Sequence, residues 1–269
     1  MISVLLATYN WPAALSLCLQ ALREQTNKNF EIIICDDGSK DETKTLIAEF
    51  QKDFPVPIKH LWQEDDGFRK TLILNQGIKS ANGEYLVFLD GDCIPQIDFI
   101  DQHLKLSEKN HLVTGSRILS NQQLTNNLCS SGYWSHQKLR NNVLTWGLKG
   151  FLNKWLPLFI KLPNFSGRLY KKFEWRRIKG CNMACWKSDA EAIGGFDESL
   201  LGWGHEDADL AIRLIRYGVR RKDGQFALPV LHLWHRENDR SELRKNVDLL
   251  NSTLTSSVTL AKAGIAEIK

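Results

Sequence analysis

Short apolar segments alternate with helical segments through the first 116 residues, and this alternation restricts the fold more than any other feature. Strands are expected at 2–7, 30–35, 58–62, 85–89 and 111–115, with helices at 13–24, 42–52, 70–80 and 97–106. Strands that are apolar throughout are buried on both faces, as in parallel sheets covered by helices. The pattern therefore predicts a single α/β domain with a mostly parallel sheet flanked by helices.

Two helix starts carry cap-like residues. Asn10 is expected to cap the first helix, with Pro12 in its first turn. Ser39 and Glu42 have the spacing of a capping box before the second helix.

Composition excludes several classes of protein. Hydrophobic residues are 43% and charged residues 25%, and 35 Lys and Arg against 31 Asp and Glu give a net charge of +4. This is ordinary globular composition, and so mild a charge does not predict a nucleic-acid partner. The six Cys form no CxxC pair, which favours buried thiols in a reducing compartment. With no basic leader and no run of 18 apolar residues, we expect a cytoplasmic protein.

Polar motifs follow three of the expected strands, at residues 8–10, 36–39 and 90–92. The carboxyl ends of parallel strands line the crevice where such sheets bind ligands. Asp90 and Asp92, separated by Gly91, offer hard oxygen ligands for Mg²⁺ or Mn²⁺, although a solvated turn is the alternative. Asp36 or Asp37 can accept a hydrogen bond from a base or a ribose, and an Asx turn is compatible with that role.

Residues 117–177 lose the alternation and form a basic aromatic insert. Between 138 and 179, 11 Lys and Arg stand against Glu174 alone, interleaved with Trp and Phe. One interpretation is docking at an anionic membrane surface; the other is an insert whose aromatics pack on the sheet. A phosphate-rich acceptor would also be attracted. Membrane or nucleic-acid binding as the main function would need no paired Asp at strand ends, so we disfavour it.

Regular structure is expected again from 178, with strands at 178–186 and 228–234 and helices at 206–217 and 239–263. We divide the chain into a nucleotide-binding half (1–116), the insert (117–177), an acceptor or catalytic half (178–240) and a C-terminal helix (241–269). Asp207 is the only polar residue on an otherwise apolar helix face, where burial can tune a carboxylate as a base. His232 and His235 are ordinary core or surface histidines or, together with Asp92, metal ligands.

These motifs together resemble family 2 glycosyltransferases of the A fold, which have a Rossmann-like nucleotide-sugar-binding sheet. Gly195-Phe196-Asp197-Glu198, followed by Gly202-Trp203-Gly204-His205-Glu206-Asp207, is especially similar to the galactosyltransferase and chondroitin-polymerase branch. The resemblance covers about residues 1–116 and 178–240.

The resemblance implies a role for each matching residue. Asp207 would be the catalytic base and Glu206 an acceptor ligand. Asp92 would bind the metal, with His232 as the third-ligand position and His235 its competitor; Asp90 would contact ribose or metal. The remaining implied nucleotide-sugar contacts are Thr8, Tyr9, Asn10, Asp36, Asp37, Asp65, Arg69, Asn75, Gly91, Asn182 and Trp203.

The implied reaction is an inverting transfer of a sugar from a UDP-sugar to a hydroxyl of a saccharide or glycolipid acceptor, with Mn²⁺ or Mg²⁺ as cofactor. We expect a peripheral enzyme on the inner face of the cell membrane, working in lipopolysaccharide or other surface-glycan synthesis. The alternatives are a soluble acceptor and a non-catalytic membrane-surface protein. GxGxxG and GxxxxGK[ST] are absent, which argues against dinucleotide and P-loop chemistry.

Overall fold

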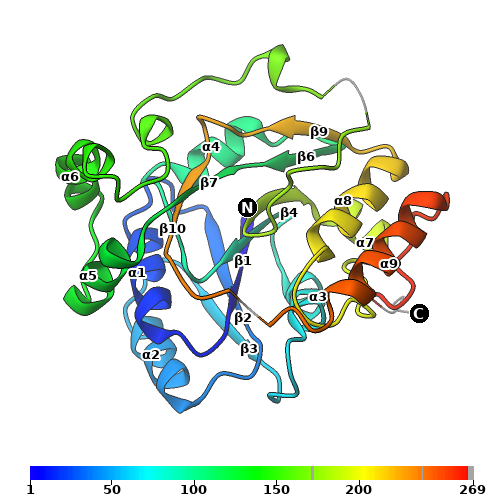
Figure 1. The fold of residues 1–269 in the computed structure, drawn as a ribbon, viewed down its shortest axis with the longest axis horizontal. Helices are drawn as coiled ribbons and strands as arrows, with labels where there is room; N and C mark the ends of the chain where they lie inside the picture. Colours follow the sequence, from blue (N-terminus) through cyan, green and yellow to red (C-terminus); the bar gives the residue numbers. More distant parts are fainter. Residues whose placement is uncertain (171–172, 238, 266–269) are drawn as a thin grey trace.

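The computed structural model describes residues 1–170, 173–237 and 239–265 and contains a central sheet flanked by helices (Figure 1). The central sheet has seven strands in the order β3-β2-β1-β4-β8-β6-β9, and a smaller sheet has the order β5-β10-β7. The central strands are β1 (Ile2–Thr8), β2 (Phe30–Asp36), β3 (Ile58–Trp62), β4 (Tyr85–Asp90), β6 (His111–Thr114), β8 (Asn182–Trp186) and β9 (Arg220–Asp223). The small sheet contains β5 (Cys93–Pro95), β7 (Ser116–Leu119) and β10 (Pro229–His232).

The first half of the sheet confirms the predicted parallel α/β arrangement. β1 pairs in parallel with both β2 and β4, and β2 pairs in parallel with β3. Every residue of β1 and β2 is buried, which explains why these strands are mostly apolar rather than alternating. Because the strands run the same way, the segments after β1, β2 and β4 gather at one edge.

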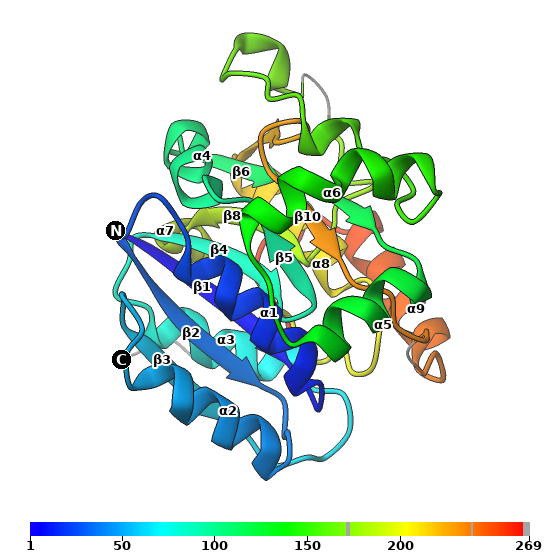
Figure 2. The same ribbon diagram turned by 90° about the vertical axis from the view of Figure 1, so that its left-hand side faces the viewer.

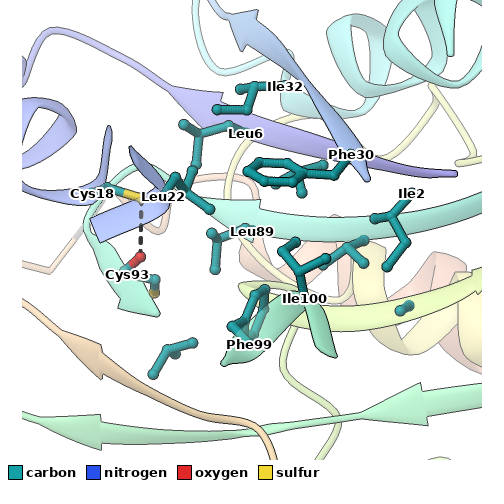
Figure 3. Close-up of a cluster of buried hydrophobic side chains, with 14 of the residues drawn as sticks. Ile2, Leu6, Cys18, Leu22, Phe30, Ile32, Leu89, Cys93, Phe99 and Ile100 are labelled. Carbon is teal, nitrogen blue, oxygen red and sulfur yellow. Dashed lines mark hydrogen bonds between the residues drawn. The ribbon is translucent and has the colours of Figure 1, made fainter. Parts of the chain in front are cut away.

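Helices cover both faces of this sheet. The helices are α1 (Pro12–Arg23), α2 (Asp41–Gln51), α3 (Lys70–Ser80), α4 (Phe99–Leu106), α5 (Gln122–Ser131), α6 (His136–Leu148), α7 (Lys187–Ala192), α8 (Glu206–Tyr217) and α9 (Leu243–Thr255). One core packs α1, α2 and α4 against the sheet, and Figure 3 shows part of it around Phe30 and Phe99. A second core packs α3, α7 and α8 against the opposite face. The six Cys are unpaired, and five of them are buried.

The two predicted helix caps are wrong. Asn10 has a positive φ of 46°, and its side-chain Oδ1 accepts from the Lys40 backbone N–H at 2.9 Å. The Ser39 hydroxyl accepts from the Asn10 backbone N–H at 2.9 Å instead of capping α2. These two polar residues therefore connect the loop after β1 to the loop after β2. Their side chains bond to the neighbouring loop instead of capping the helix that follows them.

β8 enters the sheet antiparallel to β4, with Asn182 opposite Leu89. The strand starts at Asn182 rather than at the expected residue 178, since 178–181 form the approach to it. An antiparallel strand brings its first residues, not its last, to the edge where β4 ends. The segment just before β8 thus lies beside the acidic end of β4.

The insert contains two helices that pack near α1. Buried Trp134 and Trp146 join Leu17 in a third core that links α5 and α6 to α1 and the small sheet. Figure 2 shows α5 beside α1. Farther along, the Tyr170 backbone N–H donates to Arg221 O at 3.0 Å, so the chain covers the free edge of β9. The aromatic side chains of this part are thus packed, but on α1 and the small sheet rather than on the central sheet.

Another part of the insert exposes apolar side chains. Leu148 is 76% exposed, Phe159 52% and Phe165 50%. In the parts of the chain that the structure describes, no helix combines the length and apolarity needed to cross a membrane.

The C-terminal helix is shorter than predicted. α9 ends at Thr255, and 256–265 are not helical; 266–269 lie outside the described residues. Thr255-Ser256-Ser257 interrupts the helix because these side chains compete for backbone hydrogen bonds. The Ala261 and Ile265 backbone N–H groups instead donate to Ile193 O and Gly194 O at 2.9 and 2.8 Å.

Candidate active site

A cleft of about 1550 Å³ opens at the carboxyl ends of β1, β2 and β4. Polar side chains from both halves of the chain line it, including Thr8, Asp37, Asp92, Asp207 and His232. The size exceeds that of an ordinary small-ligand pocket, so the cleft has room for more than one small molecule. The sequence motifs at the strand ends thus come together with those of residues 202–207.

Asp92, His232 and His235 form a group suited to a metal ion. One ligand atom from each lies within 4.8 Å of the others, and Asp92 Oδ2 is 3.8 Å from His232 Nε2 and 3.5 Å from His235 Nε2. β10 positions the histidines by pairing antiparallel with β5, next to Asp92. Burial lowers the pKa of His232 although Asp92 opposes the shift, which favours the neutral imidazole that binds cations. Both predicted histidines therefore lie at the same candidate site.

Asp90 bonds to a lysine and is not part of the group formed by Asp92, His232 and His235. Lys70 Nζ, at the first residue of α3, donates to Asp90 Oδ1 at 2.6 Å. Burial would lower the pKa of the Lys70 ammonium, but the carboxylates of Asp90 and Glu206 outweigh it and raise that pKa. Lys70 therefore stays charged and offsets two of the carboxylates in the cleft.

Asp207 lies in the first turn of α8, beside the start of β8. Its Oδ2 accepts from the Gly180 backbone N–H at 2.8 Å, and its Oδ1 accepts from the Ala208 backbone N–H at 2.7 Å. A carboxylate oxygen has a further lone pair, so each can accept another hydrogen bond. The carboxylate is thus fixed in direction while it remains able to take a proton from a bound hydroxyl.

Glu206 differs from its neighbour in electrostatics. Burial and the negative charge of Asp207 raise the pKa of Glu206 to about 7, even though Lys70 opposes the shift. Two adjacent carboxyl groups with one of them readily protonated are an arrangement typical of acid–base sites. The chain enters this helix through Gly204 and His205, both at positive φ, which forms the tight turn that brings α8 to the cleft.

The two aspartates after β2 have different surroundings. Asp36 is fully buried and does not line the cleft; its Oδ1 accepts from the Ser39 N–H at 2.8 Å and its Oδ2 is 3.0 Å from His60 Nε2. Asp37 does line the cleft, and it accepts from the Arg69 backbone N–H at 2.8 Å. Of the alternatives Asp36 and Asp37, the second has the geometry to touch a ligand.

The other predicted contacts divide in the same way. Tyr9, Arg69, Gly91 and Trp203 line the cleft, whereas Asn10, Asp65, Asn75 and Asn182 do not. The Asp65 carboxylate accepts from the Tyr9 hydroxyl at 3.0 Å and so orients a cleft residue from outside.

Two asparagines outside the cleft connect segments of the fold. Asn75 Nδ2 donates to Phe196 O at 2.9 Å and to Glu198 Oε1 at 2.8 Å. Asn182 Nδ2 donates to Leu228 O at 2.7 Å and to Ser116 O, in the first half, at 3.2 Å. Both side chains are buried, so their amide groups serve the packing of the second half against the first.

Sequence reasoning missed Lys70 and Arg117 as cleft residues. A signal for Lys70 was present: a cation at the first position of a helix is unfavourable beside the positive end of the helix dipole, unless a carboxylate compensates it. Arg117 gives no such signal, since it enters the cleft only through the pairing of β7 with β10.

Two family patterns match this chain, one over its first part and one over its second. The pattern described as "Glycosyl transferase family 2" matches residues 3–174, and that described as "N-terminal domain of galactosyltransferase" matches residues 162–235. The second match contains Asn182, Trp203, Glu206, Asp207 and both histidines. Together the matches include every cleft residue considered above.

Two curated relatives are polysaccharide synthases. The chain is 28% identical to the hyaluronan synthase of Pasteurella multocida, over 81% of this chain and 23% of that protein. It is 26% identical to the chondroitin synthase of Escherichia coli, over 81% of this chain and 32% of that protein. The chain thus spans a quarter to a third of the length of these relatives.

Solved structures share the fold at low identity. A mannosyltransferase from Pyrobaculum calidifontis in complex with GDP-Man and Mn²⁺ has a TM-score of 0.61 at 17% identity, covering 97% of this chain and 65% of that chain. S. aureus TarS 1–349 in complex with UDP has a TM-score of 0.59 at 15% identity, covering 98% and 67%.

Proposed function

Because this chain belongs to glycosyltransferase family 2 and is an enzyme that uses nucleotide sugars, we propose that it moves a sugar from a UDP-sugar to a hydroxyl of a saccharide acceptor, with inversion. The observation that carries this proposal is the single cleft in which Asp92, His232 and His235 lie together with Asp207. A leaving diphosphate needs positive charge and an attacking hydroxyl needs a base, and the two groups match these needs.

Asp92, His232 and His235 would hold the divalent cation. Two imidazole nitrogens depart from the all-oxygen sets that Mg²⁺ prefers, so we favour Mn²⁺ over Mg²⁺. When bound, the ion would neutralise the negative charge that develops on the departing diphosphate. The mannosyltransferase neighbour is described with Mn²⁺, which agrees with this choice.

In the proposed reaction, Asp207 accepts the proton of the acceptor hydroxyl as its oxygen attacks the anomeric carbon. The Gly180 and Ala208 N–H groups hold the carboxylate in one direction. Lys70 offsets the charge of Asp90 and Glu206 next to the base. One displacement inverts the anomeric centre, so no covalent intermediate on the protein is required.

For the donor, we propose contacts from the cleft residues at the strand ends: Thr8, Tyr9, Asp37, Arg69, Asp90, Gly91 and Trp203. Gly91 approaches Thr8 closely; a Cβ there would lie 3.3 Å from the Thr8 hydroxyl oxygen and 3.1 Å from Ala7 O. We propose UDP rather than GDP as the nucleotide of the donor. The TarS structure is described with UDP, which supports this choice, whereas the mannosyltransferase is described with GDP-Man, so GDP is the alternative to test.

For the place of work, we propose a peripheral enzyme on the inner face of the cell membrane that extends a lipid-linked or other surface glycan, of the lipopolysaccharide type. The support is α6, where exposed Arg140, Leu144 and Leu148 share one face, together with exposed Phe159 and Phe165 farther along the insert. Apolar side chains next to cations suit the interface of an anionic bilayer.

The decisive experiment is calorimetry of UDP and GDP with and without Mn²⁺, followed by a screen of UDP-sugars for hydrolysis. We expect UDP to bind more tightly than GDP, and EDTA to abolish both binding and turnover. Asp92→Ala should weaken both, whereas Asp53→Ala, an exposed carboxylate outside the cleft, should change neither. Full turnover in EDTA would refute the metal mechanism, and tighter binding of GDP would refute the donor.

A further inference from the structure

Five further cations line the cleft. Arg176 and Arg177 end the insert, Lys179 lies just after it, Arg117 belongs to β7, and Arg236 to the segment after β10. We call Arg176, Arg177 and Lys179 the cationic wall. The wall residues line the same cleft as Asp207. We therefore ask which ligand of this cleft would bind their positive charges.

The charged groups of the wall form no salt bridge among the residues that the structure describes. Salt bridges within 4.0 Å pair the other cleft cations: Arg69 with Asp66, Lys70 with Asp90, Arg240 with Glu237 and Lys245 with Glu242. Glu174 is the acidic neighbour of the wall, but its carboxylate accepts from the Arg176 backbone N–H at 2.9 Å and not from a guanidinium. Their charges are therefore available to a ligand.

The backbone of the wall is fixed by a buried arginine. The Arg221 guanidinium, only 6% exposed, donates to Glu174 O at 3.1 Å and to Arg176 O at 2.8 Å. Trp175 packs against α8 and α9, and the Arg176 guanidinium lies 4.9 Å from the centre of its ring. A backbone fixed in this way keeps the wall residues in place at the cleft, so binding a ligand costs side-chain freedom but no ordering of the backbone.

The wall ends at the proposed base. The Gly180 N–H donates to Asp207, and Lys179 precedes Gly180 directly. Arg177 is three residues away, so its Cα is within about 11 Å of the Cα of Gly180. An anionic group bound by the wall would therefore lie close to the hydroxyl that Asp207 deprotonates.

We propose that the acceptor saccharide carries a carboxylate or phosphate group near its reacting hydroxyl, and that the cationic wall binds this group. The inference rests on the proposed function, since it identifies the second substrate of the same cleft. Guanidinium groups bind both oxyanions through paired hydrogen bonds, and these charge-assisted bonds are stronger than neutral ones. The metal group and the strand ends are left for the donor.

The test compares three sugars that differ in one substituent. Protein saturated with UDP and Mn²⁺ is titrated with glucose, glucuronic acid and glucose 6-phosphate by NMR or calorimetry. We expect one or both charged sugars to bind about tenfold more tightly than glucose, because a hydrogen bond to a charged group contributes more than a neutral one. The preferred sugar identifies the oxyanion.

A matched pair of variants locates the effect. R176Q/R177Q/K179Q should bind the three sugars equally and keep the affinity for UDP. R140Q/K149Q/K154Q removes the same charge from insert residues of similar exposure outside the cleft, and it should keep the preference for charged sugars. Thermal unfolding of both variants checks that each is folded.

Several results would overturn the inference. They are equal binding of all three sugars to the wild type, an undiminished preference in the wall variant, and an equal loss in the matched variant. Loss of UDP affinity in the wall variant would assign the wall to the donor. If the wall variant lost its binding to phosphatidylglycerol vesicles while its sugar binding stayed unchanged, the wall would be assigned to lipid phosphate. UDP binding to the wild type is measured in a separate titration. Failure to bind UDP there would refute the proposed function rather than this inference.

Discussion

Asp207 and Glu206 are adjacent in sequence, yet the structure gives them different chemical properties. Asp207 accepts two backbone hydrogen bonds that fix the direction of its carboxylate. Burial and the charge of Asp207 raise the pKa of Glu206 to about 7. Asp207 is therefore positioned to accept a proton from a bound hydroxyl, and Glu206 can exist in either form at neutral pH.

We predict that Asp207→Asn lowers kcat about 100-fold or more while the affinity for UDP stays close to that of the wild type. The loss is confined to kcat because proton removal occurs only in the transition state. Steady-state kinetics and calorimetry with UDP measure the two quantities separately. Glu206→Gln is the matched comparison, since it removes the neighbouring carboxylate at nearly constant shape. A larger loss of kcat in Glu206→Gln than in Asp207→Asn would transfer the role of base to Glu206.

At the scale of the elements, α4 packs against the sheet through a buried histidine. His103 is fully buried between Phe99 and Tyr85, and neither ring nitrogen has a hydrogen-bond partner. Burial lowers the pKa of His103 to about 3. The helix therefore packs with a neutral imidazole, and protonation favours the unfolded chain.

We predict that this contact makes the fold sensitive to acid. Between pH 6.5, the ordinary pKa, and pH 3, the unfolded state binds a proton that the folded state does not. Stability is therefore retained above pH 6.5 and falls on acidification, by at most about 1.4 kcal/mol per pH unit from this group. Urea unfolding at pH 7.5 and pH 5 should show a smaller loss for His103→Leu than for the wild type. Equal losses would contradict the prediction.

How much the sequence predicts differs between elements, and the reason is the range of the interactions. β1, β2, β4 and their helices follow from local hydrophobic pattern, because each strand is buried on both faces. α5 and α6 were not predicted, since their apolar residues are shared with α1 more than a hundred positions away. The positions of His232 and Asp207 beside the strand ends likewise depend on long-range pairing. The resemblance, rather than the pattern, indicated these two.

At the scale of the whole molecule, one side of the insert combines exposed apolar and cationic residues. Arg140, Leu144 and Leu148 are exposed and spaced four apart on α6, so they share a face of the helix. Lys171 and Lys172 lie outside the described residues. This face and the cationic wall of the cleft are separate surfaces that single variants can distinguish.

We predict that the protein sediments with phosphatidylglycerol vesicles and not with phosphatidylcholine vesicles, and that salt weakens the binding. R140Q/K149Q/K154Q should reduce the partition coefficient by up to about 100-fold at low salt, since each cation near such a surface contributes about 1 kcal/mol. R176Q/R177Q/K179Q is the control here and should bind vesicles as the wild type does. Equal sedimentation with both lipids would favour a soluble acceptor.

The antiparallel direction of β8 determines which residues of the insert reach the cleft, and so which of them related proteins could vary. Because β8 starts at the cleft, the last residues of the insert reach the reaction centre, whereas its helices lie on α1. Gly180, just after the insert, donates its backbone N–H to Asp207, and a Cβ there would lie only 3.1 Å from Asp207 Cβ, so this position favours glycine. If the cationic wall binds the acceptor as proposed, substitutions upstream of Gly180 would alter acceptor preference and leave Asp207 and the strand ends in place. Exchanging residues 117–179 between relatives would then transfer acceptor choice and leave donor choice with the recipient.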